Sequence, residues 1–189
     1  ISLTVTAAAQ KITLKAASGS SLTKTYGASA FPLKASTSGN GKLTYKSSDK
    51  KTAVVSSAGK VTLKGYGKAV ITVTAAKTKL YKKAVKTLTI VVRPARMAAV
   101  AATNPSSKTA LLKWKKDSRA DGYQIRYSTG SGMANALIKT VKSNSLLQLN
   151  VTGLTKGKTY YFQIRPYKIV DETNNTAVFG EWSKSKKLA

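Results

Sequence analysis

The 189 residues carry 33 Lys and Arg against 6 Asp and Glu, a formal net charge of +27, and contain neither Cys nor His. This composition excludes thiolate chemistry, imidazole-based triads, the usual zinc sites and any disulfide. No run approaches the roughly 18 consecutive apolar residues of a membrane-spanning helix, and the length allows one domain or two.

Residues 1–10 alternate apolar and polar side chains, with Ile1, Leu3 and Val5 on one parity. This period of two predicts a β-strand, which is either the first strand of the domain that follows or the last strand of a preceding one. No signal-peptide pattern opens the sequence, so such a peptide is either absent or already removed. We expect the chain to be a segment of a longer multidomain protein.

Residues 11–41 continue with short extended segments. Ile12 and Leu14 share one parity, and apolar side chains alternate again at residues 31–35. A Ser-Gly-Asn-Gly turn follows at residues 38–41. Asn-Gly is a strong hairpin signal, because both residues accept the positive φ angles of a two-residue turn. The sequence therefore predicts a hairpin turn at Asn40 and Gly41.

Residues 42–76 hold short alternating runs that we interpret as consecutive antiparallel strands. Turn residues at 47–49, 58–59 and 65–67 separate the runs. Lys, Ser and Thr fill the opposite parity, which is typical of strands with one buried and one exposed face. The apolar members of the runs are Leu43, Tyr45, Ala53, Val55, Val61, Leu63, Ala69, Ile71 and Val73.

Three motifs of the first half occur in order: Ser-Ser at 47–48 precedes a loop, A-x-V-x-x-x-G-x-V spans 53–61, and Gly67 leads into A-x-I-x-V-x-A at 69–75. With these motifs the first half resembles a bacterial immunoglobulin-like domain of group 2. A closing strand follows at Leu88, Ile90 and Val92. The resemblance implies a β-sandwich that serves as a surface module.

A domain boundary is expected at residues 93–96, Arg-Pro-Ala-Arg. Proline has no backbone N–H and cannot continue a strand's hydrogen-bond ladder, so the chain leaves one sheet here and enters another. The predicted domains are residues 1–94 and residues 95–189.

Residues 98–189 contain Trp114, a Tyr-x-Ile-x-Tyr pattern at 123–127, Leu154 followed by Tyr160, and Gly-Glu-Trp-Ser at 180–183, in that order. With these landmarks the segment resembles a fibronectin type III domain. The resemblance assigns the tryptophan to the core of the second strand, the Tyr-x-Ile-x-Tyr pattern to the third strand, Leu154 and Tyr160 to a tyrosine corner whose hydroxyl ties a loop, and Gly-Glu-Trp-Ser to the start of the final strand. Lys156 stands where that family often has proline. The structural residues so assigned are Trp114, Tyr123, Leu154, Tyr160 and Trp182. The predicted fold is all-β, with two tandem immunoglobulin-like and fibronectin type III β-sandwiches.

One face of the second sandwich is a candidate binding surface. If Tyr160, Phe162 and Ile164 point inward, the residues between them point outward, as do two residues of the neighbouring strand. Such a face suits a glycan or a protein partner, although cross-strand pairs of large residues also stabilise a sheet without binding anything. The outward residues are Gln124, Arg126, Tyr161, Gln163, Arg165 and Tyr167.

Catalysis has few candidate residues. The acids are Asp49, Asp117, Asp121, Asp171, Glu172 and Glu181. Residues 171–172 lie close to Asn174 and Asn175, and we interpret the group as a polar turn rather than a calcium site. The sequence predicts no catalytic residue, no metal site and no cofactor, so we expect a noncatalytic protein.

The positive charge has two readings. Most Lys residues lie on the parity opposite the apolar residues, which is typical of a solvated face that keeps strand edges from pairing. The alternative is adhesion to a polyanion such as teichoic acid, acidic glycan or nucleic acid. The few Arg residues are scattered, which argues against sequence-specific nucleic-acid recognition.

The two resemblances imply a secreted or wall-attached protein of a Gram-positive bacterium. We expect a noncatalytic adhesion or spacer segment whose partner is a host protein, a glycan or an anionic cell-wall polymer. The alternative is an accessory module of a larger extracellular enzyme, a polysaccharide hydrolase or a peptidase, whose catalytic domain lies elsewhere.

Overall fold

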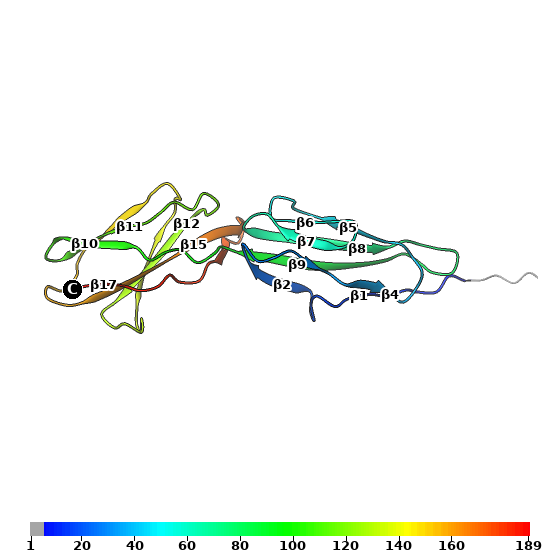
Figure 1. The fold of residues 1–189 in the computed structure, drawn as a ribbon, viewed down its shortest axis with the longest axis horizontal. Coiled ribbons are helices and arrows are strands. Elements are labelled where there is room, and N and C mark those ends of the chain that lie inside the picture. Colours follow the sequence, from blue (N-terminus) through cyan, green and yellow to red (C-terminus); the bar gives the residue numbers. More distant parts are fainter. Residues whose placement is uncertain (1–5) are drawn as a thin grey trace, which may run out of the picture. The chain divides into compact units, whose positions relative to one another are not determined.

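The computed structural model describes residues 6–189, and the chain divides into two compact units, Ile1–Val92 and Arg93–Ala189 (Figure 1). The described residues form strands, turns and loops without a helix, which confirms the predicted all-β fold. None of them therefore belongs to a helix long and apolar enough to cross a membrane. The predicted strand at residues 1–10 lies partly outside the described residues, at positions 1–5.

The described part of the first unit, residues 6–92, forms nine antiparallel strands, the last of which extends to Arg93. β2, β9, β8 and β5 form one sheet in that order, β3, β7 and β6 form another, and β1 pairs with β4. The strands are β1 (Ile12–Leu14), β2 (Ser21–Thr25), β3 (Phe31–Pro32), β4 (Ala35–Thr37), β5 (Leu43–Ser47), β6 (Ala53–Val55), β7 (Lys60–Leu63), β8 (Gly67–Ala75) and β9 (Ala84–Arg93).

The core of the first unit follows the predicted alternation. Ala69, Ile71 and Val73 of β8 are completely buried, whereas the residues between them are partly exposed. They belong to one cluster with Ile12 of β1 and Val61 of β7. Because burying a Val or Ile side chain contributes about 1.5–3 kcal/mol, this alternation holds the sheets together without disulfides.

The buried side chain of Gln10 forms hydrogen bonds with several loop segments of the first unit. Its Nε2 donates hydrogen bonds to the carbonyl oxygens of Ala76 and Lys82, at 2.9 and 2.7 Å. Its Oε1 accepts from the Thr37 hydroxyl at 2.9 Å and from the Gly41 N–H at 3.4 Å. Residue 10 is therefore tied by its side chain to three separate segments of the first unit, residues 37–41, Ala76 and Lys82.

The predicted hairpin at Asn40 and Gly41 is wrong. β4 pairs with β1 and β5 pairs with β8, so residues 38–41 carry the chain from one sheet to another. Neither Asn40 nor Gly41 has the positive φ that a two-residue hairpin turn requires. Glycine is needed for close packing instead, because a Cβ at Gly41 would lie 2.2 Å from the Ala76 carbonyl oxygen and 2.8 Å from Gln10 Nε2.

The second unit contains eight strands. β10, β11 and β14 form one sheet, and the other has the order β13, β12, β15, β16, with β17 also paired to β15. The strands are β10 (Ala101–Ser106), β11 (Thr109–Lys113), β12 (Gly122–Ser128), β13 (Leu137–Val141), β14 (Gln148–Val151), β15 (Tyr160–Asp171), β16 (Thr176–Phe179) and β17 (Lys186–Leu188).

The register of β12 and β15 decides which side chains face outward in the second unit. Tyr127 lies opposite Phe162 and Ile125 opposite Ile164, and all four are buried. They belong to the core cluster that also contains Leu112 of β11. The residues at the alternate positions of β12 and β15 consequently share the outer face of the sheet.

Candidate functional site

The outer face of β12 and β15 contains two cross-strand pairs that are hydrogen-bonded side chain to side chain. Gln124 lies opposite Arg165, and Arg126 lies opposite Gln163. The Nε and a terminal nitrogen of Arg165 donate to Gln124 Oε1 at 3.0 and 2.7 Å. Arg126 Nε donates to Gln163 Oε1 at 2.7 Å. The structure thus brings four of the six predicted binding residues together.

Aromatic rings stack on both guanidinium groups of this face. The Trp182 ring centroid lies 4.6 Å from Arg126 Cζ and 4.2 Å from Arg165 Cζ, and Phe179 covers Arg165 at 4.3 Å. Phe179 in turn packs on Tyr167 with centroids 6.0 Å apart. Each cation–π contact contributes about 0.5–2 kcal/mol. We call this series, Arg126, Trp182, Arg165, Phe179 and Tyr167, the stacked row.

Burial changes the electrostatics of the stacked row. It lowers the pKa of Arg165, and the positive charge of Arg126 lowers that pKa further. Burial also lowers the pKa of Arg126. Both guanidinium groups stay protonated at neutral pH, because the ordinary value is far above it. The face therefore keeps two closely spaced positive charges, which are tolerated because the aromatic rings and amide oxygens are their neighbours.

A break in the last strand places Trp182 over the sheet. β16 pairs with β15 as far as Phe179 opposite Tyr167, and β17 resumes at Lys186 opposite Phe162. Residues 180–185 thus run beside residues 163–166, which leaves two extra residues on the outer strand. Ser183 anchors this segment: its N–H donates to the Ile164 carbonyl, and its hydroxyl accepts from the Ile164 N–H at 3.0 Å. Trp182 is therefore held outside the regular strand.

A pocket of about 390 Å³ lies at the Tyr167 end of the stacked row. Gln124, Thr140, Asn175 and Phe179 are among the residues that line it. Tyr167 is buried, and burial together with the nearby Asp121 charge raises the pKa of its hydroxyl. The pocket lining thus combines amide and hydroxyl groups, the Lys142 side chain and aromatic carbon.

Asp121, at the edge of this pocket, is already engaged. Its carboxylate accepts from Lys168 Nζ at 2.6 Å and from the Ile169 N–H at 2.8 Å. Tyr161, the sixth predicted residue, lies on β15 opposite Ser128 and Lys187 and is partly exposed. Tyr161 is therefore the residue of the predicted set that lies furthest from the pocket along β15.

Of the residues assigned structural roles by resemblance, four lie in or beside the core and one lies on the outer face. Trp114 and Tyr123 pack edge to face in the core, with centroids 5.5 Å apart, and the Tyr123 hydroxyl accepts from the Asp117 N–H. Tyr160 accepts from the Thr155 N–H at 3.1 Å, next to buried Leu154. Trp182 differs: it lies before β17, on the outer face rather than in the core.

No group of three or more His, Cys, Asp or Glu side chains gathers anywhere in residues 6–189. Asp171 instead accepts hydrogen bonds from the backbone N–H and the side-chain amide of Asn174, at 3.2 and 2.8 Å. These bonds stabilise the turn between β15 and β16.

Sequence reasoning missed Phe179 and Ser183, and it placed Trp182 in a strand. The alternation of β15 identified its outward residues, but stacking from the next strand depends on the two extra residues in 180–185. The available signal was a Trp followed by Ser and Lys residues, in a segment that begins with Gly180. That signal does not state over which face the ring lies.

Comparison with known proteins identifies both units. Residues 25–77 match the family model of the intimin immunoglobulin-like domain, and residues 94–185 match that of the fibronectin type III domain. The family matched by the first unit is therefore the intimin immunoglobulin-like domain. The sequence motifs had suggested the group 2 bacterial immunoglobulin-like domain instead. A search of the curated proteins gave no match.

Two solved structures illustrate what the chain is similar to, and the first of them agrees with it in fold. A two-domain fibronectin type III segment of chicken tenascin is 18% identical, with a TM-score of 0.50 over 77% of this chain and 81% of the tenascin segment. The sixth fibronectin type III domain of human fibronectin type III domain containing protein 3 is 15% identical, with a TM-score of 0.38 over 50% of this chain and 82% of that domain. The chain therefore carries a bacterial immunoglobulin-like domain followed by a fibronectin type III domain.

Proposed function

We propose that the chain is a noncatalytic adhesion or spacer segment of a bacterial extracellular protein, and that it associates with anionic polymers. The observation that carries this proposal is the charge of +27, spread over exposed Lys residues of both units. Lys46, Lys60 and Lys68 are exposed in the first unit, and Lys113 and Lys139 in the second. Domains of both families are typically noncatalytic modules, which supports the first part.

Acidic side chains of the protein itself neutralise only a small part of its positive surface charge. Ion pairs among residues 6–189 join Arg96 to Glu181 and Lys168 to Asp121. A surface with such an excess of one sign attracts polyanions over several ångströms and raises their association rate. The same attraction would hold a spacer close to phosphate-rich wall polymers or acidic glycans.

Binding to immobilised poly(glycerol phosphate) is expected to weaken steeply as NaCl rises from about 0.1 M to about 1 M, because the Debye length falls from about 10 Å to about 3 Å. Surface plasmon resonance measures this dependence. Neutral dextran serves as the control surface and should retain nothing at either salt concentration. Absence of binding at low salt, or binding that ignores salt, contradicts the proposal.

The pocket at the end of the stacked row supports a second candidate function, recognition of a glycan or a protein through the outer face. Gln124 and Thr140 line the pocket, and Tyr161 lies on the same face. Arg165 is a poor residue for a test, because its stacking on two rings makes its removal destabilising. Tyr161 is partly exposed and Thr140 is exposed, so both can be replaced for a test.

The double variant Tyr161→Ala, Thr140→Val is expected to lose any binding to glycans or host proteins that survives about 1 M salt, with little change in thermal stability. A glycan and protein array read at high salt, together with a melting curve, checks this. Salt-resistant binding that persists unchanged in the variant shows that the outer face is not the site.

A further inference from the structure

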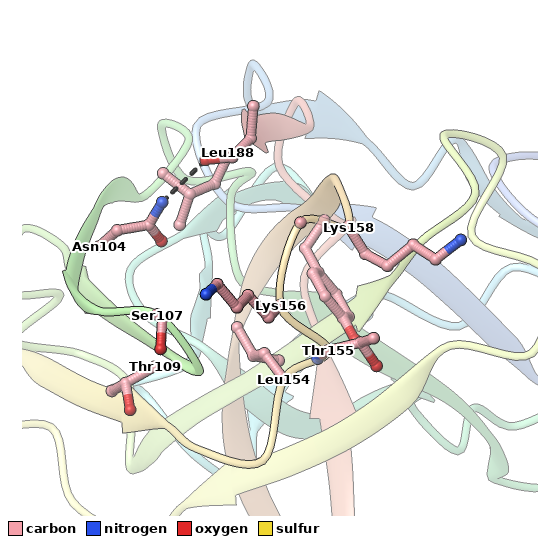
Figure 2. Close-up of a pocket in the computed structure, with 11 residues that line it drawn as sticks. Asn104, Ser107, Thr109, Leu154, Thr155, Lys156, Lys158 and Leu188 are labelled. Carbon is pink, nitrogen blue, oxygen red and sulfur yellow. Dashed lines mark hydrogen bonds between the residues drawn. The ribbon is translucent and has the colours of Figure 1, made fainter.

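A pocket of about 270 Å³ lies at the opposite end of the second unit from the Asp121 side. The β10–β11 turn, the loop at residues 152–159 and the last residues of the chain form its walls. Figure 2 shows the Lys156 side chain extending its amine between Asn104 and Ser107, whereas the amine of Lys158 points away from them. Of the two Lys residues that line the pocket, Lys156 is therefore the one whose ammonium group points toward Asn104 and Ser107.

Apart from the two Lys residues, the polar side chains that line this pocket are hydroxyls and one amide. Ser107, Thr109, Thr155 and Tyr160 all line the pocket, and no carboxylate side chain does. Hydroxyls donate hydrogen bonds readily, and an ammonium group donates up to three. No ion pair forms with Lys156 among residues 6–189. This donor set matches an anionic group.

The walls of the pocket are held in place by hydrogen bonds. The Leu154 N–H donates to the Lys108 carbonyl, which joins the loop to the β10–β11 turn. The Thr155 N–H donates to the Tyr160 hydroxyl and lowers the pKa of that group, as does the nearby Lys158 charge. Asn104 Nδ2 donates to the Ala189 carbonyl at 2.8 Å. A ligand would find the pocket largely preformed.

Charge is unevenly distributed along the second unit. Asp121 precedes Gly122, which lies opposite Tyr167, and residues 171–172 follow at the far end of β15. The pocket lies at the other end of β15, beside Tyr160, and Lys108 and Lys186 lie in the neighbouring turn and strand. The pocket end consequently carries cations that the acids at the far end of β15 do not neutralise.

We propose that this pocket binds one phosphate, sulfate or carboxylate group of an anionic polymer, with the Lys156 ammonium providing the charge and Ser107 and Thr109 providing hydrogen bonds. The inference rests on the proposed association with anionic polymers and names the group that is contacted. Lys156 stands where a fibronectin type III domain often has proline, so this cation is a departure of this chain from the pattern.

The first test titrates inorganic phosphate into the full chain and follows backbone amide signals by NMR. We expect the amides of Ser107, Thr155 and Lys156 to shift together, and Lys156→Ala to weaken the apparent affinity about tenfold, as expected for losing one charge-assisted hydrogen bond. Lys116→Ala is the matched control, since it removes the same charge from an exposed loop outside the pocket. Equal effects of the two variants overturn the proposal.

The second test compares polymers. Poly(glycerol phosphate), heparin and polygalacturonate supply phosphate, sulfate and carboxylate groups, and the polymer whose binding depends most on Lys156 identifies the source. If the wild-type chain binds none of them, the proposed function fails. If it binds but Lys156→Ala and Lys116→Ala weaken binding equally, only the pocket fails and the attraction is diffuse.

Discussion

Replacing Gln10 with Ala is expected to lower the free energy of unfolding of the first unit by about 3 kcal/mol. The substitution removes four hydrogen bonds and leaves the carbonyls of Ala76 and Lys82, the Thr37 hydroxyl and the Gly41 N–H without this partner. A buried polar group that loses its partner costs about 1–3 kcal/mol. The figure of about 3 kcal/mol allows for water reaching part of the vacated space.

The two units offer separate readouts for this experiment. Both Trp residues, Trp114 and Trp182, lie in the second unit, so Trp fluorescence follows that unit alone, and amide hydrogen exchange of β8 follows the first. Gln148→Ala makes the same chemical change at an exposed site and should cost less than about 0.5 kcal/mol. A Gln10→Ala variant with unchanged exchange in β8 contradicts the assigned role.

Trp182→Ala is expected to destabilise the second unit by about 2–3 kcal/mol. The ring stacks on Arg126 and Arg165 at once, so its loss removes two cation–π contacts and exposes both guanidinium groups to water. Burial of the ring carbon adds to the cost, although the side chain is only partly buried. Urea denaturation followed by the fluorescence of the remaining Trp114 measures the change.

Trp182→Phe provides the matched comparison. A smaller ring keeps an aromatic face over the two guanidinium groups, so it should recover about half of the lost stability, whereas Trp182→Leu should recover less because it lacks the π face. If Leu restores stability as well as Phe does, the ring acts by covering apolar area alone, and stacking with Arg126 and Arg165 contributes nothing measurable.

The alternation of residues predicted the fold well where one side chain in two is buried. In β8, burial of Ala69, Ile71 and Val73 determines which face of the strand points into the core, as the alternation predicted. The turn at Asn40 and Gly41 was predicted wrongly, because local turn preference was overridden by Gln10, whose partners lie 27 to 72 residues away. A contact of that separation leaves no periodic signal.

Parity predicted which side chains of β12 and β15 share the outer face, but not how they bond. Gln124 and Arg126 lie on one face with Gln163 and Arg165, because paired strands in register share their faces. It did not show which amide accepts from which guanidinium, and it gave Trp182 a place in a regular strand. The two extra residues in 180–185 move that ring, and a bulge of this kind alters side-chain direction without altering composition.

The division of the last strand also determines how the second unit would carry mechanical load. β10 begins at the end where the chain enters the unit, and Ala189 lies beside Asn104 at the other end, so tension along the chain pulls β17 parallel to β15. Backbone bonds loaded in this direction break together rather than one by one. The Ser183 anchor and the ring of Trp182 extend the resisting contact over residues 180–185, where ladder bonds are interrupted. Single-molecule force spectroscopy would measure the contribution of that contact as a rupture force.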